Sequence, residues 1–178
     1  VHTAKQAKKI IALGVEKVAI SSAALEQPEL ITRIADEIGS QSVVVVLDIK
    51  KKRFSKNYEV WTHNATRNTK RNIFDVITEI EVMGAGEVVI NSIDNDGQMK
   101  GYDIKLVFEL RKIVNIPLTI LGGAGSLDDM REAVSTCGLI GMSAGSLFIF
   151  KGPYRAVLIS YPDEQQKNDI VFSALLSR

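Results

Sequence analysis

Hydrophobic residues recur three and four positions apart in four stretches of the chain, a spacing that predicts amphipathic helices. The stretches are marked by Ala7, Ile10, Ile11 and Leu13; by Leu30, Ile31, Ile34 and Ile38; by Ile73, Val76, Ile77, Ile80 and Val82; and by Leu106, Val107, Leu110 and Val114. Between them lie short runs rich in β-branched residues, at 15–21, 42–49, 87–93, 116–121 and 138–143. Continuous apolar runs are typical of strands buried on both faces, so we expect a parallel sheet covered by helices.

Glycine positions support this division. Gly14, Gly39, Gly84 with Gly86, and Gly138 each stand between a helical stretch and the next strand, where a left-handed helix end favours glycine. Since no linker or low-complexity segment interrupts the pattern, we expect residues 1–178 to form a single domain of repeated β–α units.

One segment departs from the helix–strand alternation. Residues 50–56 are basic and polar, which is typical of a loop. Residues 58–63 then alternate polar and apolar side chains, as an exposed strand does. We interpret them as a surface hairpin inserted after the second strand.

Composition narrows the class of protein. Of 178 residues, 46% are hydrophobic and 24% are charged, a balance that excludes a disordered or collagen-like chain. The 22 Lys and Arg residues against 21 Asp and Glu give a net charge of +1, which argues against a nucleic-acid or anionic-membrane partner. The longest apolar run, at 43–47, has the length of a strand and not of the ~20-residue helix that crosses a membrane.

The cysteine content and the start of the chain add three expectations. The single cysteine, Cys137, excludes a disulfide framework and fits a reducing compartment. No charged and then apolar signal segment opens the chain, so we expect a cytoplasmic location. The chain begins at Val1 without methionine and enters a helical pattern at once, so we expect further residues to precede it.

Two α/β architectures remain open at this point. Five predicted strands are too few for a closed eight-stranded (β/α) barrel, which typically takes about 250 residues. An open parallel sheet is the alternative. Both gather chemistry in the loops that follow the carboxyl ends of the strands. The polar or glycine-rich residues at these positions are Ser21 and Ser22, Asp48, residues 91–97, residues 122–126 and residues 143–146.

Asp48 is the strongest single candidate for a catalytic residue. It follows the apolar run 43–47, so we expect its carboxylate at a strand end in a partly dry pocket. A carboxyl group in such a place can be tuned for acid–base work near neutral pH. The alternative is a structural carboxylate that pairs with Lys50 or Lys51.

Two glycine-rich segments predict a phosphate site. Residues 122–126 and 143–146 are small and stand directly ahead of helices. Glycine lets backbone N–H groups approach an anion, and a helix N-terminus adds partial positive charge. Two such segments on adjacent strands resemble the phosphate site formed by the last two loops of many barrels. The alternative is that the glycines only cap helices.

The sequence predicts no metal or cofactor. Asp94 and Asp96 resemble the start of a calcium loop, but the later ligands, ending in a glutamate, are missing. His2 and His63 are too far apart in sequence to argue a metal site. No nucleophile triad and no P-loop lysine pattern is present.

Five motifs together carry a resemblance to a known family. They are LGVEKVAISSAALEQPELI, VVVLDIK, GAGEVVINSIDNDGQMKGYD, LGGAGSLDD and SAGSLF. From Ala4 to about Lys151, the chain resembles the cyclase subunit of imidazole glycerol phosphate synthase. The family fold is an eight-stranded (β/α) barrel. The resemblance implies that this chain covers the fourth to eighth strands and lacks the first three β/α units.

The resemblance implies a reaction and a partner. A glutaminase subunit releases ammonia, which passes through the barrel core to the top face. There it reacts with a bis-phosphorylated ribulosyl-formimino aminoimidazole carboxamide nucleotide, and ring closure and cleavage give imidazole glycerol phosphate for histidine biosynthesis. This is a lyase reaction, and Asp48 matches the second of the family's two catalytic aspartates, a general acid. The first aspartate lies on the family's opening strand, outside this sequence.

The resemblance also implies binding residues. Those for the phosphorylated substrate are Ser21, Ser22, Asn64, Asn91, Asp96, Gly97, Gly122, Gly123, Gly145 and Ser146. Lys17 and Glu87 match two charged residues of the ammonia gate at the bottom of the barrel. Ordinary ion pairing at the surface is the alternative for these two residues.

Several positions depart from the histidine-pathway pattern. Asn64 and Leu121 stand where that enzyme usually has serine, Asn91 stands where it usually has threonine, and the ending FKGPYRAVLISYP also differs. In these features the chain is similar to paralogues found with surface-polysaccharide genes, which are thought to supply ammonia or an amidated intermediate to a sugar amidotransferase. The acceptor substrate stays open between the two pathways. A barrel that conducts ammonia without cyclisation is a third alternative.

Overall fold

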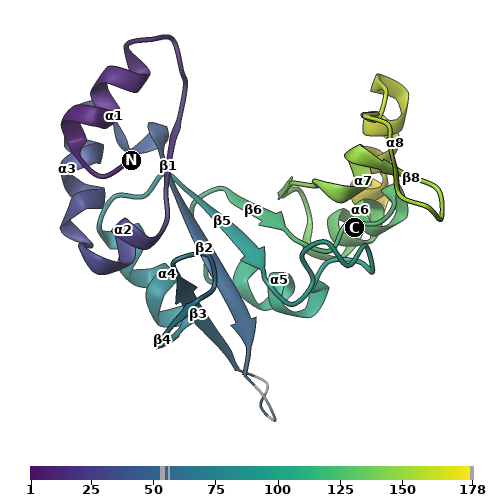
Figure 1. Cartoon of the computed structure of the whole chain (residues 1–178), viewed down its shortest axis with the longest axis horizontal. Helices are drawn as coiled ribbons and strands as arrows, with labels where there is room; N and C mark the ends of the chain where they lie inside the picture. The colour runs from purple at the N-terminus through teal and green to yellow at the C-terminus, as the bar shows by residue number, and fades with distance from the viewer. Residues whose placement is uncertain (53–54, 56, 177–178) are drawn as a thin grey trace. The chain divides into compact units, whose positions relative to one another are not determined.

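Helices and strands alternate along the chain, as the hydrophobic pattern predicts (Figure 1). The computed structural model describes residues 1–52, 55 and 57–176. The chain divides into two compact units. The first unit contains residues 1–91 and 113–118, and the second contains residues 92–112 and 119–178.

The first unit contains a mixed sheet. Its elements are α1 (Ala4–Ile11), β1 (Val18–Ile20), α2 (Ser22–Glu26), α3 (Glu29–Ile38), the 3₁₀ turn η1 (Ser40–Ser42), β2 (Val43–Lys51), β3 (Tyr58–Thr62), β4 (Arg67–Asn72), α4 (Ile73–Val82) and β5 (Glu87–Ser92). β1 runs parallel to β2, β5 is the next strand to β2, and β3 is antiparallel to both β2 and β4. The parallel pairing at the centre of this sheet confirms the predicted α/β class.

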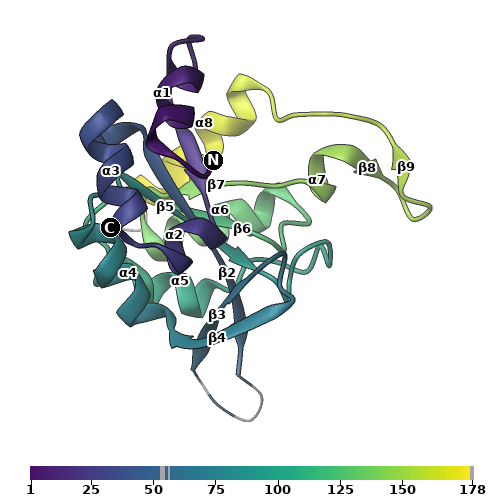
Figure 2. The ribbon, with the colours of Figure 1, turned by 60° about the vertical axis from the view of Figure 1, so that its left-hand side comes forward.

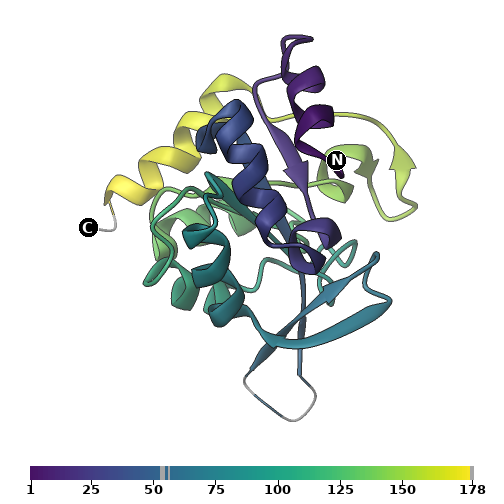
Figure 3. The same cartoon turned by 90° about the vertical axis from the view of Figure 1, so that its left-hand side faces the viewer.

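One face of this sheet is covered by helices. α3 packs on β2, α4 packs on β3 and β4, and α1 lies beside α3 (Figure 3). Val45, Leu47 and Ile49 of β2 and Val88 and Ile90 of β5 are buried on that face. Side chains alternate between the two faces of a strand, so Asp48, Glu87 and Asn91 point to the opposite, partly exposed face. The polar candidates on β2 and β5 therefore share one face.

The second unit has a smaller parallel pair. Its elements are α5 (Ile104–Arg111), β6 (Leu118–Leu121), α6 (Leu127–Cys137), β7 (Gly141–Met142), α7 (Ser146–Ile149), β8 (Phe150–Lys151), β9 (Ala156–Val157) and α8 (Glu164–Leu176). β6 and β7 are parallel, with Ile120 opposite Met142. α6 packs against α5 and α8, while β8 and β9 form a short hairpin directly after α7 (Figure 2).

The segment after β2 corrects one expectation. The predicted hairpin is present, because β3 pairs antiparallel with β2, but its strand is not exposed, since Tyr58, Val60 and Thr62 are buried. β3 lies between β2 and β4 and under α4, which covers every second side chain. The expected loop at 50–56 is also different, because β2 continues to Lys51. Residues 53, 54 and 56 lie outside the described residues.

Two of the predicted strands are present but shorter than expected. The predicted strands at 15–21 and 138–143 are reduced to Val18–Ile20 and Gly141–Met142. Gly14, Gly39, Gly84 and Gly138 have positive φ, as predicted for left-handed helix ends, but Gly86 does not. Gly86 is required for packing instead, because a Cβ there would lie 2.0 Å from the carbonyl oxygen of Ser40. In the described part of the chain, no helix is both long enough and apolar enough to cross a membrane.

Candidate functional site

Asp48 and Asn91 form the centre of the first candidate cluster. They project from neighbouring strands, β2 and β5, and Asn91 Nδ2 donates a hydrogen bond of 2.8 Å to Asp48 Oδ1. Both side chains are partly buried. The hydrogen bond from the amide fixes the orientation of the carboxylate. Asp48 and Asn91, which were predicted separately as site residues, are therefore in direct contact.

The surroundings of this pair contain unsatisfied polar atoms. Asn91 Oδ1 and the indole Nε1 of Trp61 are buried, and neither has a hydrogen-bond partner. Trp61 stands opposite Asp48 in the antiparallel pairing of β2 and β3. Buried polar atoms are normally hydrogen-bonded, so one donor and one acceptor near Asp48 are available to a bound molecule.

Ser21, Ser22 and Asn64 belong to a second cluster, at the loop after β1. Ser22 Oγ accepts a 2.8 Å hydrogen bond from the backbone N–H of His63, the residue before Asn64. Glu26, at the end of α2, contacts both His63 Nε2 at 2.7 Å and Arg67 at 3.6 Å. The turn between β3 and β4 is thereby tied to the loop that carries the two serines.

That turn is locally strained. His63, Asn64 and Ala65 have φ of 53°, 53° and 63°. Three consecutive left-handed residues without a glycine are unfavourable for L-amino acids. The bonds from Ser22 and Glu26 offset this cost. Asn64 is exposed at the tip of the turn, where a ligand can reach it.

Lys17 and Glu87 form an ion pair at the opposite end of the strands from Asp48 and Asn91. Lys17 Nζ lies 2.6 Å from Glu87 Oε2, and Glu87 opens β5 while Asn91 is near its end. The Glu87 side chain is 15% exposed and the Lys17 side chain is 47% exposed. The two residues that the resemblance links to a gate are thus in contact.

The predicted phosphate residues of the second unit line one small pocket, a recess with a volume of about 10 Å³. It is bordered by Asp96, Gly97, Leu121, Gly122, Gly123, Ala124, Ser143, Ala144, Gly145 and Ser146. Leu121 ends β6 and Ser146 begins α7, and the other lining residues come from the loops after β5, β6 and β7. Six predicted binding residues, Asp96, Gly97, Gly122, Gly123, Gly145 and Ser146, therefore meet in one place.

Some backbone N–H groups near this pocket are bonded within the protein, and others have no acceptor there. Asp129 Oδ2 accepts hydrogen bonds from the N–H groups of Gly125 and Ser126, at 2.7 and 2.9 Å, and caps α6. Within the described residues, no protein acceptor is found for the N–H groups of Gly123 and Gly145. An anion in the pocket would therefore meet Gly123 and Gly145 rather than the capped start of α6.

Gly123 has a structural requirement of its own. A Cβ atom there would lie 2.1 Å from the carbonyl oxygen of Gly101, whose N–H donates to Gly123 O at 2.9 Å. Gly145 differs, because a Cβ built on it meets nothing within 4 Å. The glycine at 123 is needed for packing whether or not phosphate binds, whereas the one at 145 leaves open space.

Tyr102 is hydrogen-bonded to a residue that lines the pocket. Its hydroxyl donates a 3.0 Å hydrogen bond to the carbonyl oxygen of Ser143, one of the lining residues. Burial, and to a lesser degree the nearby Asp129 carboxylate, raises the pKa of Tyr102 above its ordinary value. The phenol is therefore neutral and keeps its proton for this bond.

Sequence reasoning missed three of these contributors. Asp129 carried a usable signal, because Ser126 followed three positions later by an acidic residue is the capping-box pattern. Tyr102 and His63 carried none, since their roles depend on contacts with Ser143 and with Ser22 and Glu26. Among the residues with described positions, no group of three or more His, Cys, Asp and Glu side chains could hold a metal ion.

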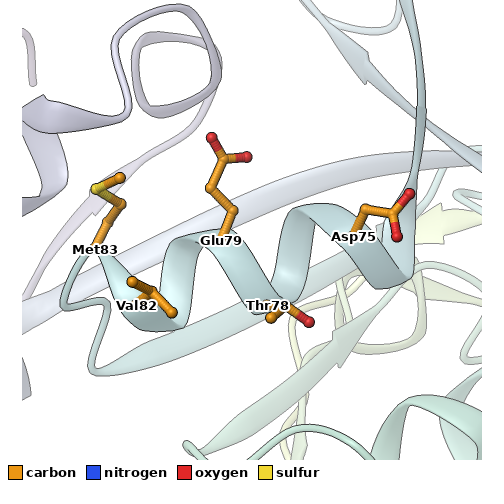
Figure 4. Close-up of a pocket in the computed structure, with 5 residues that line it drawn as sticks. All are labelled: Asp75, Thr78, Glu79, Val82 and Met83. Carbon is orange, nitrogen blue, oxygen red and sulfur yellow. The ribbon is translucent and has the colours of Figure 1, made fainter.

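A separate hollow lies on the outer face of α4. Asp75, Thr78, Glu79, Val82 and Met83 line it, over about 390 Å³ (Figure 4). All five side chains belong to α4 or to the residue directly after it. The hollow is wide and open, and it contains none of the residues that the sequence nominated.

Comparison with known proteins identifies the family. The model of the family described as "Histidine biosynthesis protein" matches residues 1–154. The chain belongs to the histidine biosynthesis protein family. A protein of Vibrio vulnificus, provisionally named an imidazole glycerol phosphate synthase subunit, is 47% identical over 94% of this chain. A Leptospira borgpetersenii protein with the same provisional name is 48% identical over 91% of the chain.

The match to other members of the histidine biosynthesis family is lower. The imidazole glycerol phosphate synthase subunit HisF of Dictyoglomus thermophilum is 41% identical over 80% of the chain. The chain spans 64% of the length of the Vibrio and Leptospira relatives and 56% of the Dictyoglomus one. It is therefore similar to part of each relative.

Proposed function

We propose that this chain is the larger part of an ammonia-using cyclase subunit of the imidazole glycerol phosphate synthase type. The remaining length of the relatives would complete a single (β/α)₈ barrel domain around the strands described above. The observation that carries this proposal is the pocket in which Asp96, Gly97, Gly122, Gly123, Gly145 and Ser146 meet. Glycine-rich loops after adjacent parallel strands are the usual phosphate site of such barrels.

The pocket would hold one phosphate of the substrate. The N–H groups of Gly123 and Gly145 would donate hydrogen bonds to the phosphate oxygens, because the Asp129 carboxylate already takes those at the start of α6. Ser146 Oγ would add a hydroxyl donor. The cyclase substrate is bis-phosphorylated, and Ser21 and Ser22 of the first unit are the candidates for its other phosphate.

Asp48 would then act as the acid–base group. A general acid must be protonated before it gives its proton, and its neighbour must tolerate both states. Asn91 suits this role, since its amide donates to the ionised carboxylate and its unused Oδ1 can accept from the protonated one after a flip of the amide. The reaction is a lyase-type ring closure and cleavage that consumes ammonia from a glutaminase partner.

A second candidate function is supported by the pattern of identity. The chain is 44–48% identical to four provisionally named relatives and 35–41% identical to four relatives named as imidazole glycerol phosphate synthase subunits without that qualification. Leu121 lines the phosphate pocket, and an apolar side chain there cannot donate to a phosphate. Both observations favour a paralogue that supplies ammonia, or an amidated intermediate, to a different acceptor.

One assay separates the two functions. The full-length protein is supplied with ammonia and the histidine-pathway nucleotide, and formation of imidazole glycerol phosphate is measured. Turnover supports the cyclase function. Binding of inorganic phosphate without turnover supports the paralogue, and absence of both contradicts the phosphate site itself.

A further inference from the structure

The segment that departs from the family pattern, residues 150–162, is folded back on α7. Leu158 N–H donates to Ile149 O and Ser160 N–H donates to Phe148 O, each at 2.8 Å. The rings of Phe148 and Tyr161 are 5.0 Å apart. Because α7 begins at Ser146, a residue of the phosphate pocket, these contacts fix the β8–β9 hairpin relative to the pocket.

Arg155 stands at the turn of this hairpin. Its N–H donates to Gly152 O at 3.1 Å, and its φ of 50° is unusual for a residue other than glycine. Its guanidinium lies 4.8 Å from the centre of the Phe150 ring, which holds the cation by a cation–π interaction. Arg155 Nη2 donates to the carbonyl oxygen of Gly97 at 3.4 Å.

The pocket that contains Gly97 lacks a positive charge of its own. Asp96 is the ionisable residue among those that line it, and its charge is negative. Amide donors alone would have to hold a phosphate dianion beside that carboxylate. A guanidinium presents five N–H donors in a plane, and one bond to Gly97 leaves others to meet phosphate oxygens.

We propose that Arg155, carried by the β8–β9 hairpin, is the side-chain cation of this phosphate site. Its ligand is a phosphate monoester dianion, and the residue makes one bond to Gly97 and others to the phosphate. The proposal rests on the proposed phosphate-binding function of the pocket. It assigns a role to the segment whose sequence departs from the family pattern, and it places the cation at the rim, where Phe150 orients it.

The test is the affinity of the full-length protein for inorganic phosphate, measured by calorimetry. Arg155→Gln keeps a polar side chain and removes the charge, and the dissociation constant should rise about tenfold. Arg155→Lys should recover only part of the affinity, because a lysine cannot bind in the same plane as a guanidinium. Arg131→Gln is the matched control, since Arg131 is a surface arginine of the same unit that pairs with Asp128 instead.

The outcomes separate this proposal from the proposed function. An unchanged dissociation constant in Arg155→Gln, together with weaker binding in a pocket variant such as Gly145→Val, would overturn the role of Arg155 and leave the phosphate site in place. Absence of phosphate binding in the unmodified protein would overturn both. An equal loss in Arg155→Gln and Arg131→Gln would show a general charge effect and would also contradict the assignment. Phosphate-dependent shifts of the Arg155 Nε–H resonance would support it directly.

Discussion

Asn91 Nδ2 donates a 2.8 Å hydrogen bond to Asp48 Oδ1, and the two residues are 43 positions apart in the sequence. Their strands, β2 and β5, are neighbours in the sheet, and both side chains point to its partly exposed face. The bond holds the carboxylate in one orientation on a rigid element. A catalytic carboxylate gains more from such support than a structural one, because its geometry must be kept within narrow limits.

Asp48→Asn should lower ammonia-dependent turnover of the full-length protein by about 10²–10⁴-fold, the usual worth of general acid–base catalysis. The side chain keeps its size, so we expect the affinity for inorganic phosphate to change little. Steady-state kinetics and calorimetry measure the two effects, with circular dichroism to show that the fold is kept. Full turnover in this variant would make Asp48 a structural carboxylate.

Gly145→Val and Gly123→Val should fail in different ways. A Cβ at 145 meets nothing within 4 Å, so we expect Gly145→Val to keep its unfolding temperature, and because residue 145 lines the pocket we expect weaker phosphate binding. A side chain at 123 would meet the Gly101 carbonyl at 2.1 Å, so we expect loss of stability. Thermal unfolding and phosphate calorimetry on both variants test this contrast. Normal stability of Gly123→Val would contradict it.

The helices with periodically spaced apolar residues could be predicted from the sequence, but the polar strand β4 could not. α3 and α4 follow the three-and-four spacing of their buried residues, such as Ile34 and Ile77. β4 has the sequence RNTKRN, which contains no apolar residue, and its pairing with β3 places it in the sheet. Propensity carries no information about a strand that is formed by its neighbour.

In the candidate site, individual residues could be predicted from the sequence, but the contacts between them could not. Asp48 and the glycine loops were visible because they follow apolar strands. The contact between Asp48 and Asn91, and that between Arg155 and Gly97, join segments far apart in the chain. Periodicity places a residue on a face or at a strand end, but it does not give the partner that a side chain meets there.

The Tyr102 hydroxyl should make stability depend on pH in the alkaline range. Its folded pKa is raised above the ordinary value near 10 by burial and by Asp129. The stabilisation from the neutral phenol is therefore complete below about pH 10 and is lost as the pH rises above it. Tyr102→Phe should cost about 1 kcal/mol near neutrality, through the bond to Ser143, and this difference should shrink above pH 10. Urea unfolding of both proteins across that range measures it, and a constant difference would contradict the assignment.

The Lys17–Glu87 pair allows the gate and the surface ion pair to be separated. An ion pair with a half-exposed lysine contributes about 0–1 kcal/mol, so Lys17→Met should change the free energy of unfolding by no more than that. If the pair belongs to an ammonia gate, turnover driven by glutamine through the glutaminase partner should fall, while turnover with added ammonium should stay unchanged. Lys112→Met is the matched control, since Lys112 forms an exposed pair with Glu109 on α5. Equal effects of Lys17→Met on both reactions would identify the pair as a surface contact, because a gate acts only on ammonia that arrives from the partner.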